Sequence, residues 1–384
     1  MNTVGFIAAN IIETLLRLFP FPARTGLIGI GSPDRNSPVL LTCNYHLTVT
    51  RVKRLLRGMD AYLLVANSRG INVWCAATGG LFTNHDVISV LKTSGVEELV
   101  DHRHVILPQL AAAGVEAKVI QKKTGWRVIW GPVHAKNIPV FVQNDLKKSP
   151  DMRQVEFPLL QRIEMAIAWA FPISLILALI SLPFWPEAVF PLILLVWGLA
   201  LVIYAFFPFY ETRLRLDRKR KGPAIFSFER VGIQLILWIA SILAFIAYGN
   251  ASGQLSWGFM LRWSVVSLIV IIVLCIDFSG SAPVIKSGLH EDRLFTIVID
   301  TEKCKGAGFC EQVCPRDCYA IDQNHHKATM PGAERCVQCG ACIVQCPFDA
   351  ISFKNPNGET ILPETIRRFK LNLMGERAVK AKQA

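Results

Sequence analysis

Charged residues are scarce in this chain of 384 residues. Asp, Glu, Lys and Arg make up 18% of it and hydrophobic residues 52%, whereas about 25% of a typical soluble domain is charged. This scarcity, with a mean hydropathy of +0.37, excludes a disordered chain and argues against a wholly soluble one. Lys and Arg are also absent before Arg17, and Asn10 and Glu13 interrupt the first apolar run. These features exclude a secretory signal.

Residues 1–24 are predicted to form an amphipathic helix, because Asn10, Glu13 and Arg17 recur at helical spacing. Two locations suit such a helix: against the first folded domain, or on a membrane surface. We favour packing on the first domain.

Four stretches in the middle of the chain almost lack charge. They are residues 165–185, 188–210, 231–249 and 255–276, and Arg262 is the one charged residue among them. A helix needs about 20 residues to cross the hydrocarbon core, so residues 161–280 are predicted to be a transmembrane domain with four spans. A transporter or sensor has little support, because Arg262 lies close enough to a helix end to reach the interface.

Basic residues are missing from two of the three connections between these stretches. The third connection, residues 211–230, holds Arg213, Arg215, Arg218, Lys219, Arg220, Lys221 and Arg230. The positive-inside rule places it in the cytoplasm, so both ends of the chain are expected on that side of the cell membrane. The lipid bilayer is then one partner. This cluster also explains much of the net charge of +12, so nucleic-acid binding is not expected.

Residues 25–160 are predicted to be a soluble α/β domain. Short apolar runs alternate with helix-like segments such as residues 86–92, and the runs are residues 39–42, 61–66, 105–107, 115–120 and 127–130. This alternation predicts a Rossmann-like fold with a largely parallel sheet. Residues 281–295, with Gly, Ser and Pro, are predicted to be a linker. Residues 355–384 form a basic tail without an assigned role.

Eight of the 11 cysteines lie between residues 304 and 346. The run from residue 336 to 347 has the spacing C-x2-C-x2-C-x3-C-P, with Cys336, Cys339, Cys342 and Cys346 at its positions. This is the bacterial iron–sulfur pattern, whereas a zinc site usually combines two separated C-x2-C pairs. Residues 296–354 are therefore predicted to be an α+β ferredoxin-like domain that transfers single electrons.

The run from residue 304 to 315 repeats this spacing, but Ala307 stands where the second cysteine is expected. Because the fourth cysteine of each run serves the other cluster, the complete four-iron (4Fe-4S) site is assigned to Cys314, Cys336, Cys339 and Cys342. The incomplete site is left with Cys304, Cys310 and Cys346. It suits a three-iron (3Fe-4S) cluster, or a 4Fe-4S cluster with one labile or differently ligated iron. Cys318 is either a substitute ligand there or a spare buried cysteine.

A further cysteine, Cys75, lies in the string NVWCAATGG that starts at Asn72. Asn72 can cap a helix and place Cys75 at its third position, where the helix N-terminus stabilises a thiolate. Such a thiolate could bind a metal or act as a nucleophile, whereas a lone cysteine among apolar residues is more often a small core residue. The residues alone leave these alternatives open.

Residues 72–77, NVWCAA, resemble the cap-helix motif of the mercury-methylating corrinoid protein family, which is related to the corrinoid iron–sulfur protein of acetyl-CoA synthesis. The similarity also includes residues 37–47, 104–109 and 127–132, and the C-terminal segment resembles the family's two-cluster ferredoxin partner, here fused into one chain. The resemblance implies a cobalamin-type corrinoid over the α/β domain. Its lower cobalt ligand would be Cys75, the catalytic residue, with cofactor contacts from Asn72, Trp74, Cys75, Ala76 and Ala77. Consistently, the sequence lacks the D-x-H-x-x-G string that supplies a histidine ligand in other corrinoid proteins.

The resemblance further implies a membrane-bound corrinoid-dependent methyltransferase. Its ferredoxin domain would reduce the cobalt with electrons from an upstream low-potential donor, and methylated folate or a methyl donor protein would supply the methyl group. Thr78 and Gly79 replace the family's Gly-Lys, no cysteine follows Cys346, and Ala307 interrupts the first cluster motif. These departures count against mercury as the methyl acceptor. They leave a second hypothesis, a membrane-anchored ferredoxin-type electron-transfer protein with a degenerate corrinoid domain.

Overall fold

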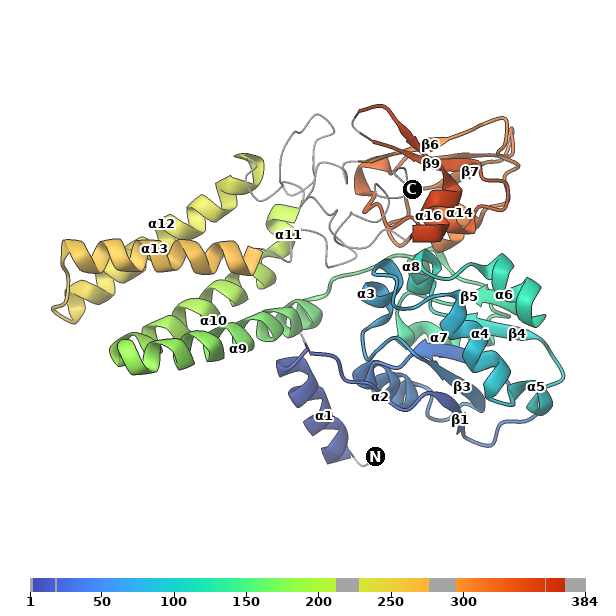
Figure 1. The fold of residues 1–384 in the computed structure, drawn as a ribbon, viewed down its shortest axis with the longest axis horizontal. Coiled ribbons are helices and arrows are strands. Elements are labelled where there is room, and N and C mark those ends of the chain that lie inside the picture. The colour runs from blue at the N-terminus through green and yellow to red at the C-terminus, as the bar shows by residue number, and fades with distance from the viewer. Residues whose placement is uncertain (1–2, 18, 212–227, 276–294, 356, 370–384) are drawn as a thin grey trace. The chain divides into compact units, whose positions relative to one another are not determined.

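The computed structural model describes residues 3–17, 19–211, 228–275, 295–355 and 357–369 (Figure 1). The chain divides into two compact units. One combines residues 1–19 with 157–291, and the other combines residues 20–156 with 292–384. Most of the basic connection 211–230, nearly all of the predicted linker 281–295, and the tail beyond residue 369 lie outside the described residues. The predicted orientation in a membrane therefore stays an expectation.

The first unit contains the four apolar helices that the sequence predicts. They are α9 (Leu159–Phe184), α10 (Val189–Ala205), α12 (Phe228–Ala251) and α13 (Trp257–Leu274), with η3 (Pro186–Ala188) before α10 and α11 (Phe207–Tyr210) after it. All four are long and apolar enough to cross a membrane, and 11–44% of their most apolar segments is buried. Helix α9 packs against α10, and α12 against α13 (Figure 1). Much of the apolar surface therefore faces outward.

The N-terminal helix α1 (Thr3–Leu15) forms as predicted, but its packing differs from our expectation. It belongs to the unit of apolar helices and contacts α9, and Arg17 forms an ion pair of 3.3 Å with Glu164 of that helix. Ile7, Ile11 and Ile12 stay exposed. Helix α1 therefore groups with the apolar helices, whose exposed side chains are of the same kind, and not with the α/β domain as we expected.

The second unit begins with a mixed α/β domain. Its sheet has the order β1-β3-β2-β4-β5, formed by β1 (Gly26–Ile30), β2 (Val39–Cys43), β3 (Ala61–Ala66), β4 (His104–Leu107) and β5 (Arg127–Trp130). All neighbours are parallel except the edge strand β1, which pairs antiparallel with β3. Every residue of β2 and β3 is buried, as expected for central strands covered on both faces.

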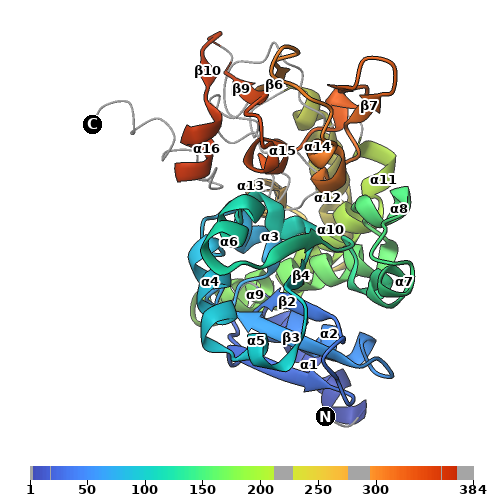
Figure 2. The same cartoon turned by 90° about the vertical axis from the view of Figure 1, so that its right-hand side faces the viewer.

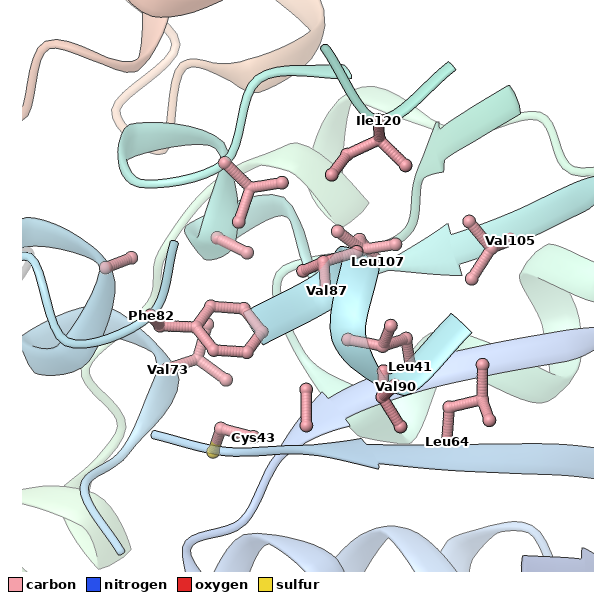
Figure 3. Close-up of a cluster of buried hydrophobic side chains, with 14 of the residues drawn as sticks. Leu41, Cys43, Leu64, Val73, Phe82, Val87, Val90, Val105, Leu107 and Ile120 are labelled. Atoms are coloured by element: carbon pink, nitrogen blue, oxygen red, sulfur yellow. The ribbon is translucent and has the colours of Figure 1, made fainter. Parts of the chain in front are cut away.

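Helices cover both faces of this sheet (Figure 2). On one side, α4 (Asn84–Thr93) and α6 (Ala117–Thr124) bury Val87, Val90 and Ile120 against Leu41 and Leu107 (Figure 3). On the other, the covering helices are α2 (His46–Leu55) and α7 (Ile138–Gln143). Shorter elements complete the domain: α3 (Val73–Thr78), α5 (Val96–Leu99), η1 (Gln109–Ala113), η2 (Ala135–Asn137) and α8 (Pro150–Arg153).

One predicted strand, residues 115–120, is wrong, because this segment leads into helix α6. Val115 and Ile120 are both fully buried, and a short apolar run of this kind suits a strand or a helix equally. The Ala, Lys and Gln residues after Glu116 favour the helix, which ends at Gly125 with a left-handed φ of 78°.

The strand order places a switch in chain direction beside β2. The chain moves from β2 to β3 on one side and then crosses to β4 on the other. In open α/β sheets, ligands bind at the carboxyl ends of the strands near such a switch. Helix α3, which follows β3, and η1, which follows β4, lie at this edge.

The rest of the second unit is a small domain of strands and short helices. Strands β6 (Thr296–Ile299), β9 (Ile351–Lys354) and β10 (Thr360–Ile361) form one antiparallel sheet, and β7 (Ala320–Asp322) and β8 (Lys327–Thr329) form another. The helices are α14 (Phe309–Val313), η8 (Ala333–Arg335), α15 (Ala341–Gln345) and α16 (Pro363–Phe369). Both cysteine runs fold around α14 and α15.

Candidate cofactor sites

The four cysteines predicted to hold the complete cluster line one pocket. Cys314, Cys336, Cys339 and Cys342 surround an empty volume of about 310 Å³. Gln338 N–H donates to Cys336 Sγ (3.4 Å), and the Tyr319 hydroxyl donates to Cys342 Sγ (3.1 Å). Such hydrogen bonds to cluster sulfurs help to set the reduction potential. We call this group the four-cysteine site.

Cys318 lies in this same pocket and is fully buried. Its N–H donates to Cys314 Sγ at 3.3 Å, and a hydrogen bond from its thiol lowers the pKa of Cys314 to about 7. The equivalent N–H in the second run is that of Ala350, which donates to Cys346 Sγ at 3.4 Å. Cys318 therefore belongs beside the complete set, and the structure does not place it as a substitute ligand for the incomplete one.

The incomplete set also gathers in one place. Cys304, Cys310 and Cys346 are buried in one core cluster, and burial raises the pKa of Cys310 to about 12, with charge on Cys304 and Cys346 adding to the effect. Ala328 N–H donates to Cys304 Sγ at 3.3 Å. We call this group the three-cysteine site. Ala307, at the missing ligand position, is exposed, so that corner of a cluster would face solvent.

The thiols of the four-cysteine site are strongly affected by burial, which raises the pKa of Cys339 and of Cys342. Iron binding must displace these protons, so the affinity for iron increases as the pH rises. Among the described residues, no three His, Cys, Asp or Glu side chains converge on a single metal ion.

Replacing Ala307 by cysteine is expected to complete the three-cysteine site. If the wild type holds a three-iron cluster, iron rises from about seven to about eight per chain, and the EPR signal of the oxidised three-iron cluster disappears. Iron analysis and EPR of the purified protein measure both changes. Replacement by serine is the control, because a hydroxyl is a poor substitute for thiolate; an unchanged EPR signal in the cysteine variant would contradict the assignment.

Cys75 lies as the sequence predicts, at the third position of α3. Asn72 caps this helix: its Oδ1 accepts the Cys75 N–H at 3.0 Å, and its Nδ2 donates to Cys75 Sγ at 3.4 Å. Both side chains are partly exposed. A metal-bound thiolate at Cys75 would thus receive a hydrogen bond from Asn72 and the favourable field of the helix N-terminus.

The other predicted cofactor contacts differ in accessibility. Trp74 is 7% exposed, and its indole N–H is buried without an acceptor among the described residues. A donor of this kind suits a polar group of a bound cofactor. Ala76 and Ala77 are fully buried in the core of the α/β domain. Cys75, Asn72 and Trp74 therefore offer a thiolate, a hydrogen-bond donor to its sulfur and a buried indole N–H, a set of groups that fits a corrinoid.

Asn44 is a part of this site that the sequence analysis missed. It is 4% exposed, follows β2, and its Oδ1 accepts three hydrogen bonds: from Ser68 N (2.8 Å), Ser68 Oγ (3.0 Å) and Gly70 N (3.0 Å). Gly70 has φ of 72°, and a Cβ there would lie 2.6 Å from Pro22 N. Asn44 thus fixes the loop between β3 and α3. A polar residue directly after a buried strand was the signal available in the sequence.

These features define a class of protein: a chain that joins a mixed α/β domain, four apolar helices and a ferredoxin-like domain with two cysteine sites. Residues 18–142 match the family model described as CO dehydrogenase/acetyl-CoA synthase delta subunit. Residues 296–348 match the model of the 4Fe-4S dicluster domain. The resemblance to the corrinoid iron–sulfur proteins of acetyl-CoA synthesis and the iron–sulfur prediction are confirmed over these two segments.

Individual relatives support the first match. The acetyl-CoA decarbonylase/synthase complex subunit gamma of Methanopyrus kandleri is 37% identical over 128 residues, which is 33% of this chain and 27% of that protein. The same subunit of Archaeoglobus fulgidus is 34% identical over 128 residues, with the same shares covered. The corrinoid/iron-sulfur protein large subunit of Moorella thermoacetica is 30% identical over 129 residues, 33% of this chain and 28% of that protein. The chain thus spans about a quarter of the length of these relatives.

Proposed function

We propose that the protein carries methyl groups on a corrinoid held at Cys75 and that its ferredoxin-like domain keeps the corrinoid reduced. The observation that supports this most is the capped helix α3 of a corrinoid-protein-like domain, with Cys75 Sγ accepting a hydrogen bond from Asn72. The corrinoid, when bound, supplies the methyl-carrying cobalt. Cys75 would supply the thiolate ligand, Asn72 would orient its sulfur, and the indole N–H of Trp74 would donate a hydrogen bond to a polar group of the cofactor.

The proposal includes the surroundings of this site. The four apolar helices cross the cell membrane, with both soluble domains on the cytoplasmic side. A methylated folate or a methyl donor protein supplies the methyl group, and a low-potential donor supplies electrons. Mercury is outside the proposal, because Thr78 and Gly79 replace the Gly-Lys of the mercury-methylating family and no cysteine follows Cys346.

Cobalt content tests this function directly. Full-length protein, produced with corrinoid supplied and purified in detergent, is expected to hold about one cobalt and about seven or eight irons per chain. Its absorption spectrum should be of the base-off type, and Cys75→Ala should change that spectrum because the lower ligand is lost. Cys275→Ala, at the end of α13, is the matched control and should leave the spectrum unchanged.

A second candidate function is electron transfer alone. All residues that line the four-cysteine pocket belong to the ferredoxin-like domain. Ala76 and Ala77 of the first domain are buried in its core. Under this alternative the purified protein holds its irons but no cobalt, whatever corrinoid is supplied. That result would refute methyl transfer and leave a membrane-anchored ferredoxin-type protein.

A further inference from the structure

The ferredoxin-like domain and the α/β domain, which belong to one compact unit, meet at η1. Helices α14 and α15 of the ferredoxin-like domain contact η1, and η1 in turn contacts α3, the helix that carries Cys75. Val313 and Ala341 are buried in the core cluster of the α/β domain, and Cys339 packs against that cluster. One predicted ligand of the four-cysteine site therefore packs against a core cluster that the two domains share.

Two buried glutamines hold this contact from opposite sides. Gln345, 7% exposed, donates through Nε2 to the carbonyls of Ala112 (2.7 Å) and Val115 (2.6 Å), and its Oε1 accepts the Ala117 N–H at 3.3 Å. Gln109, 1% exposed, donates to the carbonyl of Cys314 at 3.2 Å. Each side-chain amide supplies a hydrogen-bond partner to main-chain groups that would otherwise be buried without one.

Charged side chains extend the contact. Lys148 Nζ donates to Gln109 Oε1 (2.7 Å) and to the carbonyl of Gln312 (2.8 Å). Arg153 forms an ion pair of 2.7 Å with Glu311, in which both side chains are less than a third exposed. Burial, together with the charge of Arg153, lowers the pKa of Lys148 to about 7.

Gly114 allows the main chain after η1 to lie close to α3. A Cβ at this residue would lie 2.4 Å from Phe82 O and 2.8 Å from Ala77 O, so only glycine lets η1 and α3 meet here. The carbonyls that Gln345 binds come from the two sides of Gly114. Gln345 thus joins α15, the helix of Cys342, to the turn of main chain that contacts α3.

We propose that this contact is a fixed docking surface that presents the four-cysteine site to the corrinoid domain, with Gln345 and Gln109 as positioning residues. The inference rests on the proposed function for the identity of the acceptor. In this arrangement one electron passes from the four-cysteine cluster to the corrinoid. A low-potential one-electron donor replaces it through the three-cysteine cluster, because among the described cysteines of the two sites it is Cys339, of the four-cysteine site, that packs against the core cluster at η1.

Hydrogen–deuterium exchange of the full-length iron-loaded protein tests the docking without any corrinoid. Gln345→Met keeps the side-chain length but removes three hydrogen bonds, so amides of residues 109–117 are expected to exchange about tenfold faster or more. Gln109→Met, on the other side of the contact, should give the same result. Gln323→Met is the matched control, because Gln323 is exposed and binds within its own domain. Equal exchange in all proteins with normal iron content would overturn the docking surface.

EPR assigns the cluster that faces the corrinoid. In protein loaded with paramagnetic cobalt(II) corrinoid, the signal of the four-cysteine cluster is expected to relax faster than that of the three-cysteine cluster, and Gln345→Met should reduce the difference. The opposite order would refute the proposed electron route. Absence of bound cobalt would refute the proposed function instead, while the exchange experiment would still decide whether the domains dock.

Discussion

Cys342→Ala is expected to abolish the four-iron cluster and lower the iron content from about seven or eight to about three or four per chain. Cys342 Sγ lines the four-cysteine pocket and accepts the hydroxyl hydrogen of Tyr319. Its loss removes a ligand and leaves the buried Tyr319 hydroxyl without its acceptor. Iron analysis, together with EPR of the reduced and of the oxidised protein, measures the effect, and the signal of the three-cysteine cluster should persist.

The matched variant is Cys318→Ala, which removes a cysteine from the same pocket. Because Ala350 holds the corresponding position in the second run, alanine fits there and both clusters should be retained. Equal iron loss in the two variants would show that Cys318 is a ligand. Normal iron in Cys342→Ala would refute the four-cysteine assignment.

Asn44→Ala is expected to destabilise the α/β domain by about 3–5 kcal/mol, because each buried group left without a partner costs about 1–3 kcal/mol. Ser68 N–H, Ser68 hydroxyl and Gly70 N–H would all lose their acceptor. A loss of this size is a large part of the stability of an ordinary domain. Pulse proteolysis in urea, followed by mapping of the cuts within residues 20–156, gives the change in unfolding free energy.

Asn67→Ala supplies the comparison. Asn67 is exposed and accepts one hydrogen bond, from Arg69 N–H at 2.9 Å, so its replacement should cost less than about 1 kcal/mol. If both variants lost the same stability, the network around Asn44 would not be what fixes the loop before α3.

Local sequence patterns predicted those parts of the protein in which neighbours in sequence determine the structure. The spacing of the cysteine runs predicted which cysteines group together, because the first cysteines of a run lie in one short loop and the fourth serves the other cluster; the structure brings Cys314, Cys336, Cys339 and Cys342 to one pocket. Asn72 and Cys75 were placed correctly for a similar reason: a helix cap involves residues three apart. Apolar runs located four strands of the sheet and the four long helices, although an edge strand, β1, was missed.

Contacts between residues far apart in the chain could not be predicted from local sequence patterns. Gln345 and Ala112 are 233 residues apart; Gln345 occupies a spacer position of the second cysteine run, and Ala112 belongs to no motif. Asn44 looks like an ordinary loop residue until Ser68 and Gly70 surround it. Cys318 was associated with the vacancy at Ala307 because the sequence gives no sign of which of two adjacent sites a buried cysteine joins.

The polar character of the contact at η1 has a consequence for its affinity. A tether that keeps two domains together produces an effective concentration on the order of millimolar, at which a contact with an intrinsic dissociation constant of about 50 μM, roughly −6 kcal/mol, is about 95% occupied. A few buried amide hydrogen bonds and one ion pair are enough to supply a binding free energy of this size. The same two domains made as separate polypeptides would be largely dissociated at micromolar concentration, so covalent fusion lets this protein use a contact that a two-chain system would have to enlarge.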